Sequence, residues 1–352
     1  MRSCLFTVIQ RSSRAMHKCD PAVTIVPHGA SRRFSGPAHG ASGRRRKLYD
    51  AGMTEPARVD MPDWIRTLAA SHPFGARDRR GTANLIDAAA RARAAACIST
   101  GTSVSLARPL LGGDYNTTTT RPGFRHETWY RAAPDGTGWG QDHVVLNPHG
   151  LQNTHLDALN HVAVDGTFYG GRPVGEKQQG SADVLAPHGL VTRAIYVDIP
   201  HQRGTDWAIR PVDGTDIDAA LSGAGLVVEP GDALCLDMGR DRFEAATGHM
   251  LGGPETEQDA GGGLSGDGAR WLAEHQVSIL AWDMLDSREA KETHASAHIL
   301  TWAIGLLLLD NCDFAALREA HGRGTKVAGA LVVSLLAIEG ANGVNLNPLV
   351  LS

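Results

Sequence analysis

The chain has 352 residues, of which 42% are hydrophobic and 20% charged, a composition that supports a sizeable core in one large or two ordinary domains. Its longest apolar runs, residues 299–309 and 327–338, are shorter than the roughly 20 residues of a membrane-spanning helix, so none is expected. A formal net charge of -4 provides no general basic field for nucleic acid or for an anionic membrane.

Residues 1–52 differ in composition from the rest of the chain. They contain ten Lys or Arg residues against two acidic residues, Asp20 and Asp50, and no long apolar segment of a secretory signal. We expect them to be a disordered extension or a mis-called upstream start, with Met53 as a second plausible start. Residues 53–352 are then expected to form a single folded domain.

The first predicted helix covers residues 83–95, where strong helix formers follow Thr82 as a candidate N-cap. Apolar runs bounded by Gly, Pro and Asp predict strands over residues 190–199, 233–238, 277–282 and 331–338. Helices are predicted between or after them over residues 216–221, 268–274 and 314–320. Because helices and strands alternate along one continuous span, the sequence predicts an α/β fold.

The densest group of candidate metal ligands lies within residues 147–161, NPHGLQNTHLDALNH, and comprises His149, His155, Asp157 and His161. Imidazole and carboxylate are natural ligands for Zn, Mn or Fe. A strand directs residues i and i+2 to one face, so His155 and Asp157 are placed to hold one ion together. His161 keeps this parity if the extended path continues. The alternative is that these histidines lie in a surface loop.

A second group contains His294 and His298 and is followed by an apolar run that ends at Asp310. On a helix the two histidines would be i and i+4 and share a face. A continuous helix would separate His298 from Asp310 by about 18 Å, too far for a shared ion. A short helix, a turn at Gly305 and a strand over residues 306–310 would bring them together. Taken alone, Asp310 is more often a turn residue at a strand end than a ligand.

Together the two groups resemble the metal-dependent cyclase family, which includes bacterial kynurenine formamidase and isatin hydrolase. The family motif is His-x-Gly-Thr-His-x-Asp-x-x-x-His, and residues 154–161 match it from the threonine onward. The family also has a His followed twelve residues later by an acidic residue at a strand end, and His298 and Asp310 have this spacing. Weaker matches extend the resemblance over roughly residues 100–350.

The resemblance implies a swivelling β/β/α cyclase-type fold, a mixed sheet with flanking helices. It implies that a divalent cation, Zn or Mn, is bound by His155, Asp157, His298 and Asp310, and that His161 is the catalytic acid/base. Family members use the ion to activate water and polarise a carbonyl while a histidine moves protons. We therefore expect hydrolysis of an amide C–N bond in a small molecule, either a cyclic amide or an aryl formamide such as N-formylkynurenine, an intermediate of tryptophan catabolism.

Two positions depart from the family motif. Its first histidine falls at Leu151, whose side chain cannot bind metal, and its glycine falls at Asn153. His149 lies two residues before Leu151 and would substitute only along a different loop path. The distant acidic residue is Asp310, one methylene shorter than the glutamate of kynurenine formamidase. These departures favour one cation per chain over two.

Other classes of function find less support in the sequence. The chain has no Gly-x-Ser-x-Gly motif of a serine hydrolase and no Walker loop. Five cysteines without a Cys-x-x-Cys pair give no disulfide or zinc-finger framework, which favours a reducing, cytoplasmic compartment. Trp129, Tyr130 and Trp139 are expected to pack in a core rather than to bind substrate.

The alternative functions are a metal-dependent dehydratase or lactonase, and a non-catalytic small-molecule binder on the same scaffold. The expected partners are a small-molecule substrate and, by analogy with relatives, further copies of the chain in a homodimer or homotetramer. No nucleic-acid or membrane partner is expected.

Overall fold

The structure is a computed structural model that describes residues 58–110, 124–175, 180–249, 262–324 and 327–352. The chain divides into two compact units, one made of Gly52–Glu127 with His143–Ser352 and the other of Met1–Ala51 with Thr128–Asp142. The expectation for residues 1–52 lies outside the described residues. Among the described residues, none of the helices combines the length and apolar character that crossing a membrane requires.

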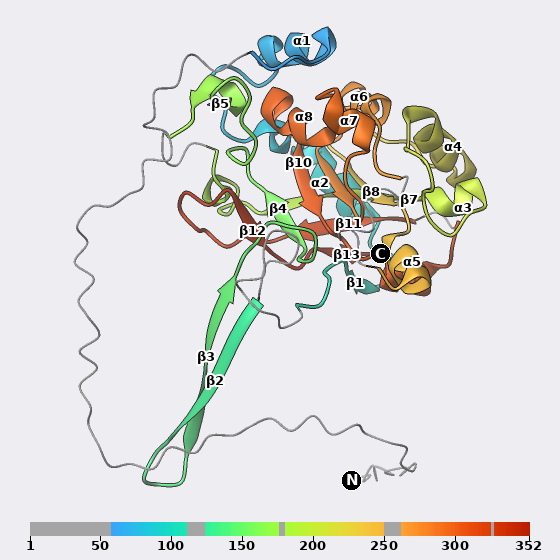
Figure 1. The fold of residues 1–352 in the computed structure, drawn as a ribbon. Coiled ribbons are helices and arrows are strands. Elements are labelled where there is room, and N and C mark those ends of the chain that lie inside the picture. The colour runs from blue at the N-terminus through green and yellow to red at the C-terminus, as the bar shows by residue number, and fades with distance from the viewer. Residues whose placement is uncertain (1–57, 111–123, 176–179, 250–261, 325–326) are drawn as a thin grey trace. The chain divides into compact units, whose positions relative to one another are not determined.

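Within the described part of the larger unit, nine strands form one mixed sheet in the order β1-β13-β11-β7-β8-β9-β10-β4-β12 (Figure 1). Four central neighbours pair in parallel: β7 (Leu190–Asp198), β8 (Ala233–Asp237), β9 (Ile279–Trp282) and β10 (Leu307–Asp310). The outer strands pair antiparallel: β1 (Ser103–Ser105), β13 (Leu349–Leu351), β11 (Val327–Val333), β4 (His155–Asp157) and β12 (Gly343–Asn345).

The parallel strands are apolar on both faces because both faces of the sheet are covered. Successive side chains of a strand point to opposite faces, so each strand contributes to two hydrophobic cores. In β8, for example, Leu234 and Leu236 belong to the first core, whereas Ala233 and Cys235 belong to the second. The first core is the one that matters for the site, because β10 and β4 place their polar residues on that face.

The helices that contribute buried residues to the first core include α1 (Asp63–Ser71), α4 (Gly214–Ala224), α6 (Gly266–Glu274) and α8 (Ala297–Ile304). Figure 1 shows α6, α7 (Arg288–Glu292) and α8 grouped together beside the sheet. On the other face, α2 (Ala88–Ala96) packs on β7 and β11, and α9 (Ala315–His321) buries Leu317 in the second core.

The remaining elements of the larger unit are short: η1 (Gly81–Leu85), β5 (Thr167–Phe168), η2 (Tyr169–Gly171), β6 (Arg172–Pro173), η3 (Ala182–Val184), α3 (Ile199–Arg203) and α5 (Arg240–Thr247).

The predicted α/β class, with a mixed sheet and flanking helices, is confirmed. The predicted strands at residues 190–199, 233–238 and 277–282 and the three predicted helices after residue 215 all appear, shifted by at most a few residues. The fourth predicted strand, residues 331–338, begins and ends earlier in the structure than expected. It is β11, which ends at Val333 where its pairing with β7 ends, and the apolar Leu336 beyond it is exposed.

The predicted helix at residues 83–95 begins later than expected, and its predicted cap is wrong. Residues 81–85 form the 3₁₀ helix η1, and α2 starts only after Asp87, whose side chain accepts the backbone N–H of Ala90. The Thr82 hydroxyl instead lies 2.6 Å from the carbonyl oxygen of Ser278 and 3.0 Å from that of Gly305. Thr82 therefore ties η1 to the sheet rather than capping a helix.

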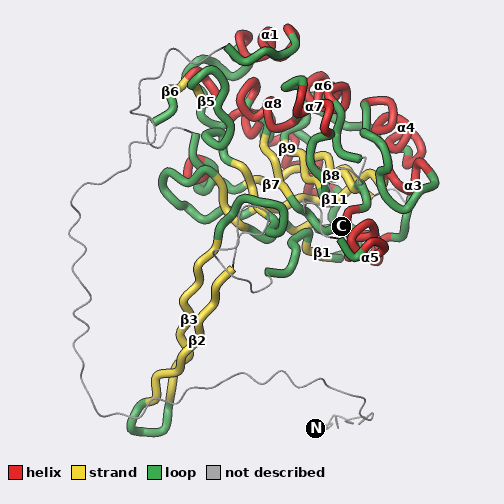
Figure 2. Tube along the Cα trace, viewed as in Figure 1, coloured by secondary structure: helices red, strands yellow, loops and turns green. Residues whose placement is uncertain are grey.

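A two-stranded hairpin of β2 (Phe124–Ala132) and β3 (Gly138–Leu146) includes the described residues of the smaller unit (Figure 2). The expectation that its aromatic residues pack in a core is wrong: Trp129, Tyr130 and Trp139 are 47%, 75% and 59% exposed. Cross-strand side-chain bonds support the ribbon, including Trp129 Nε1 to Gln141 Oε1 at 2.9 Å.

Candidate metal centre

The sheet register brings the two predicted ligand groups together. In the antiparallel pair of β4 and β10, His155 lies opposite Asp310 and Asp157 lies opposite Leu308. Directly opposed residues of antiparallel strands project to the same face, so both acids and His155 share the face of Leu308, which belongs to the first core. Helix α8, which carries His298, covers the same core.

The predicted helix, turn and strand after His298 are confirmed. Helix α8 begins after Ser296, whose hydroxyl accepts the backbone N–H of Ile299, so His298 lies in its first turn. Gly305 ends the helix with a φ of 70°, a left-handed conformation that glycine adopts at little cost, and β10 follows directly. This reversal brings the end of β10, at Asp310, back to His298.

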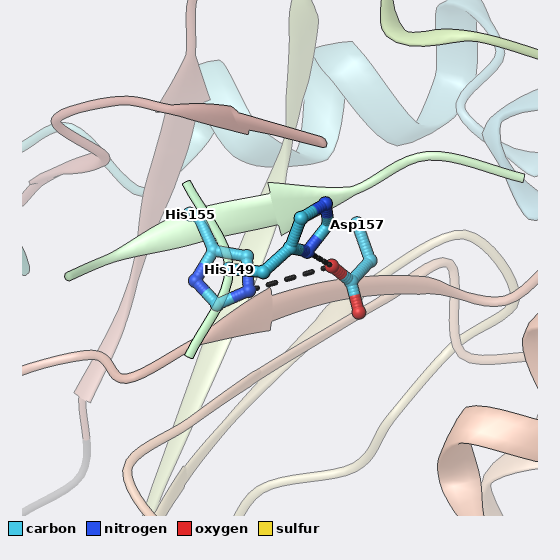
Figure 3. A group of neighbouring side chains, drawn as sticks. All are labelled: His149, His155 and Asp157. Atoms are coloured by element: carbon cyan, nitrogen blue, oxygen red, sulfur yellow. Dashed lines mark ion pairs between the residues drawn. The ribbon is translucent and has the colours of Figure 1, made fainter. Parts of the chain in front are cut away.

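Asp157 is the centre of the cluster, and four imidazoles surround it. His149 Nδ1 lies 3.1 Å and His155 Nε2 3.4 Å from Asp157 Oδ1 (Figure 3). On the other oxygen, His161 Nε2 lies 3.5 Å and His298 Nε2 3.9 Å from Asp157 Oδ2. The four candidate ligands within residues 147–161 therefore lie together, with the three histidines around the carboxylate of Asp157.

Asp310 completes the cluster from β10. Its Oδ2 lies 3.4 Å from His298 Nε2 and 4.0 Å from His155 Nε2. Its Oδ1 accepts the indole N–H of Trp282 at 2.6 Å, so only one of its oxygens faces the imidazoles. The cluster therefore contains two groups of three residues whose ligand atoms lie within 4.8 Å of one another. The first is His149, His155 and Asp157, the second is Asp157, His298 and Asp310, and Asp157 belongs to both.

The carboxylate of Asp157 fits a cation better than it fits an apolar core. Its side chain is 1% exposed, and neither of its oxygens accepts a well-formed hydrogen bond from any residue that the structure describes. A buried carboxylate without donors is costly, whereas a metal ligand needs its oxygens free. Burial alone would raise the pKa of Asp157, but His149 and His155 outweigh it and lower that pKa. Imidazole nitrogens and carboxylate oxygens are also the donor set of Zn²⁺ and Mn²⁺ sites.

Two histidines of the cluster are oriented by partners behind them. The Nδ1 of His298 lies 2.6 Å from Asp286 Oδ2, and the Nδ1 of His155 lies 2.8 Å from the carbonyl oxygen of Asn153. Both contacts assign the proton to Nδ1 and leave Nε2 facing the cluster, an arrangement typical of metal-binding histidines. Burial lowers the pKa of His298, but Asp286 and Asp310 outweigh it and raise that pKa well above 6.5.

Asp286 is a residue that sequence reasoning missed. Besides orienting His298, its Oδ1 accepts the backbone N–H of Ala297 at 2.7 Å, so one carboxylate fixes both the start of α8 and its histidine. The only signal in the sequence is an acidic residue shortly before a helix, and no spacing rule distinguishes such a residue from an ordinary surface acid.

The side chain of His149 also lies in the cluster, although the sequence left open whether it substitutes for the motif histidine at Leu151. Its ring stacks on that of His161, with centroids 4.2 Å apart and an interplanar angle of 13°. It occupies the space beside Gly343 in β12, where a Cβ would lie 2.6 Å from His149 Cε1. Leu151, at the position of the motif histidine, contributes no donor side chain.

Two details of the predicted geometry are wrong. The chain turns after β4, with the N–H of His161 donating to the carbonyl of Ala158, so His161 reaches Asp157 from a turn rather than along an extended strand. His294 shares no helix face with His298, because α8 begins only at Ala297; its Nδ1 lies 2.9 Å from the carbonyl oxygen of Asp60.

His161 lies at the more open side of the cluster. Its side chain is 30% exposed, whereas that of His155 is 3% exposed. Burial lowers the pKa of His161, and the neighbouring His149 and His298 lower it further against the opposing effect of Asp157. The ring is therefore neutral near pH 7 and able to accept a proton.

A nine-stranded mixed sheet with flanking helices and a His/Asp cluster defines a class of α/β protein with a candidate metal centre. The model of the Cyclase family matches residues 56–287, and the chain belongs to that family. The predicted family resemblance and fold are thus confirmed. The matched segment includes the motif around His155 but ends before His298 and Asp310.

Solved structures share this fold. A structure described as a novel cyclase is 21% identical, with 84% of this chain and 100% of that chain covered at a TM-score of 0.69. Isatin hydrolase A from Labrenzia aggregata, bound to benzyl benzoate, is 16% identical, with 71% and 93% covered at a TM-score of 0.52. Isatin hydrolase A from Ralstonia solanacearum is 18% identical, with 71% and 91% covered at a TM-score of 0.51. A search of curated proteins gave no match.

Proposed function

We propose that the protein is a metal-dependent hydrolase that cleaves an amide C–N bond in a small molecule, either a cyclic amide or an aryl formamide such as N-formylkynurenine. The observation that carries this proposal is the buried carboxylate of Asp157, whose two oxygens accept no hydrogen bond from the described residues and are surrounded by four imidazoles. The isatin hydrolases that share the fold are named for a cyclic amide, which supports this substrate class.

One divalent cation per chain, Zn or Mn, is proposed to be held by His155, Asp157, His298 and Asp310, with His149 as a further ligand. The two donor groups share Asp157. Trp282 donates to one oxygen of Asp310, whereas neither oxygen of Asp157 accepts a hydrogen bond from the described residues. When bound, such a cation polarises a carbonyl and lowers the pKa of water.

His161 is proposed as the acid/base. Its neutral ring accepts the proton of the attacking water as the new C–O bond forms, and returns it to the nitrogen as the C–N bond breaks. Its partial exposure allows contact with a substrate, and the stacked ring of His149 fixes its plane. The side chain of His155 is only 3% exposed and has no such access.

A substrate panel on the metal-loaded protein tests the reaction class. We expect turnover of N-formylkynurenine or of a five- or six-membered cyclic amide, measured by loss of ultraviolet absorbance of the intact amide. Turnover of lactones or dehydration of hydroxy acids alone would favour the dehydratase or lactonase alternative. Retained metal with no turnover of any compound would favour the non-catalytic binder.

We also propose a cytoplasmic homodimer or homotetramer with a small-molecule substrate and without a nucleic-acid or membrane partner. The exposed Trp129, Tyr130 and Trp139 give the β2-β3 ribbon apolar surface for a second copy to cover. Light scattering should give the mass of two or four chains, and a monomer would contradict the proposal.

A further inference from the structure

We propose that Arg240 and Asn311 are positioning residues that hold the loop carrying His149 against the metal cluster, in a chain whose motif histidine is replaced by Leu151. The inference rests on the metal site proposed above, and it concerns how this chain completes that site. Neither residue contacts Asp157. Arg240 acts through the main chain of residues 150–153. Asn311 acts through the same main chain, and its Nδ2 also lies 3.5 Å from His155 Nδ1.

Arg240, the first residue of α5, is fully buried and directs its guanidinium at this loop. One terminal nitrogen donates to the carbonyl oxygen of Leu151, and the other donates to Asn311 Oδ1 at 2.7 Å. Its Nε donates to Glu244 Oε1 at 2.8 Å, so all three guanidinium nitrogens donate hydrogen bonds. A buried cation is costly to the fold, and burial together with the nearby Arg108 lowers the pKa of Arg240 to about 10.

Asn311 joins the loop to the strand that ends in Asp310. Its side-chain Nδ2 donates to the carbonyl oxygens of Gly150 at 2.7 Å and Asn153 at 3.1 Å. Its backbone has a φ of 57°, a left-handed conformation in which asparagine is tolerated better than most residues. Because Arg240 takes the carbonyl of Leu151, the pair engages three of the four carbonyl oxygens of residues 150–153.

The orientation of these carbonyls determines where His149 lies. Gly150 has a φ of 107°, which reverses the chain directly after His149. The ring then fits beside Gly343 and stacks on His161, with its Nδ1 3.1 Å from Asp157 Oδ1. Releasing the loop carbonyls would free this turn, and His149 would lose its fixed position although no ligand had been changed.

A double-mutant cycle on the full chain separates positioning from general stability. The variants are Arg240→Met and Asn311→Gly, each alone and combined with His149→Ala. Glycine is compatible with the left-handed backbone at this position and removes the whole side chain, including the amide. The readouts are Zn²⁺ affinity by competition with a chelator and the visible spectrum of bound Co²⁺. Arg203→Met is the matched control, because the side chain of Arg203 is only 7% exposed and is paired with Asp216 away from the cluster.

We expect Arg240→Met alone to weaken Zn²⁺ binding about 10- to 100-fold, the usual effect of losing a partner behind a metal ligand, and to change the Co²⁺ spectrum. In the His149→Ala background, Arg240→Met should weaken Zn²⁺ binding by less than about threefold, because the effects of mutations at coupled residues do not add. Arg203→Met should leave Zn²⁺ affinity unchanged. Asn311→Gly should also weaken Zn²⁺ binding, and it provides the test if Arg240→Met fails to fold.

The outcomes distinguish the inference from the proposed function. A wild-type chain that binds no Zn²⁺ would overturn the metal site itself. A wild type that binds Zn²⁺, with Arg240→Met and Asn311→Gly unchanged in affinity, would overturn only the positioning role. Full additivity with His149→Ala would also overturn it, because the variants would then act independently of His149.

Discussion

Replacing Asp157 with asparagine is expected to remove tight metal binding and to lower kcat/KM by about 10³-fold or more, since a bound cation contributes several kcal/mol of transition-state stabilisation. Asparagine has nearly the same shape but no charge, and it offers one oxygen where the carboxylate offers two. Because the two donor groups share Asp157, one substitution removes the common member of both.

Thermal unfolding with and without Zn²⁺ measures this effect independently of activity. A cation at 100 times its Kd stabilises the folded state by about 2.7 kcal/mol, so the wild type should show a clear rise in Tm that Asp157→Asn lacks. Asp63→Asn, which removes an exposed carboxylate of α1, is the matched control and should keep the rise. An Asp157→Asn variant with the wild-type rise would show that the cation is held elsewhere.

Replacing His161 with alanine is expected to lower kcat by about 10²- to 10⁴-fold, the range for loss of a general acid/base, with metal content unchanged. Measuring kcat and metal content together distinguishes His161 from the metal ligands, because loss of a ligand should reduce both quantities. His161→Gln keeps a polar side chain without an acid/base group and should be as inactive as alanine. Release of the metal by His161→Ala would instead make His161 a ligand and overturn its assigned role.

The pH dependence follows from the direction of the His161 shift. Burial and the nearby His149 and His298 lower the pKa of His161 below its ordinary value of 6.5, so the neutral base predominates at pH 7. As the pH falls through that lowered pKa, the ring takes up a proton and can no longer accept one from water. The kcat/KM of the wild type should therefore be constant near pH 7 and fall at a pH below 6.5, and the residual rate of His161→Ala should lack this limb.

The local parts of the site could be predicted from the sequence. The alternation of side chains in a strand placed His155 and Asp157 on one face, and both are at the cluster. His298 and Asp310 can meet only if the chain reverses at Gly305, and that glycine has the left-handed conformation of a helix end. In these two segments, strand alternation and helix termination by glycine depend only on neighbouring residues, so they could be predicted from the sequence.

The parts of the site that escaped prediction depend on partners distant in the chain. His149 is positioned by the space beside Gly343 and by the carbonyl contacts of Arg240, and no spacing in the motif encodes either. Thr82 looked like a helix cap but is bound by the carbonyls of Ser278 and Gly305, a tertiary contact that local propensity cannot show.

The metal content of the purified full chain shows whether His155 and Asp157 hold a cation. The protein would be loaded with Zn²⁺ or Mn²⁺, dialysed and measured by elemental mass spectrometry beside a His155→Ala, Asp157→Ala double variant. We expect about one cation per wild-type chain and none in the variant, because the two substitutions remove one imidazole and the carboxylate that both donor groups share. No retained metal in the wild type, or equal retention in the variant, would contradict it.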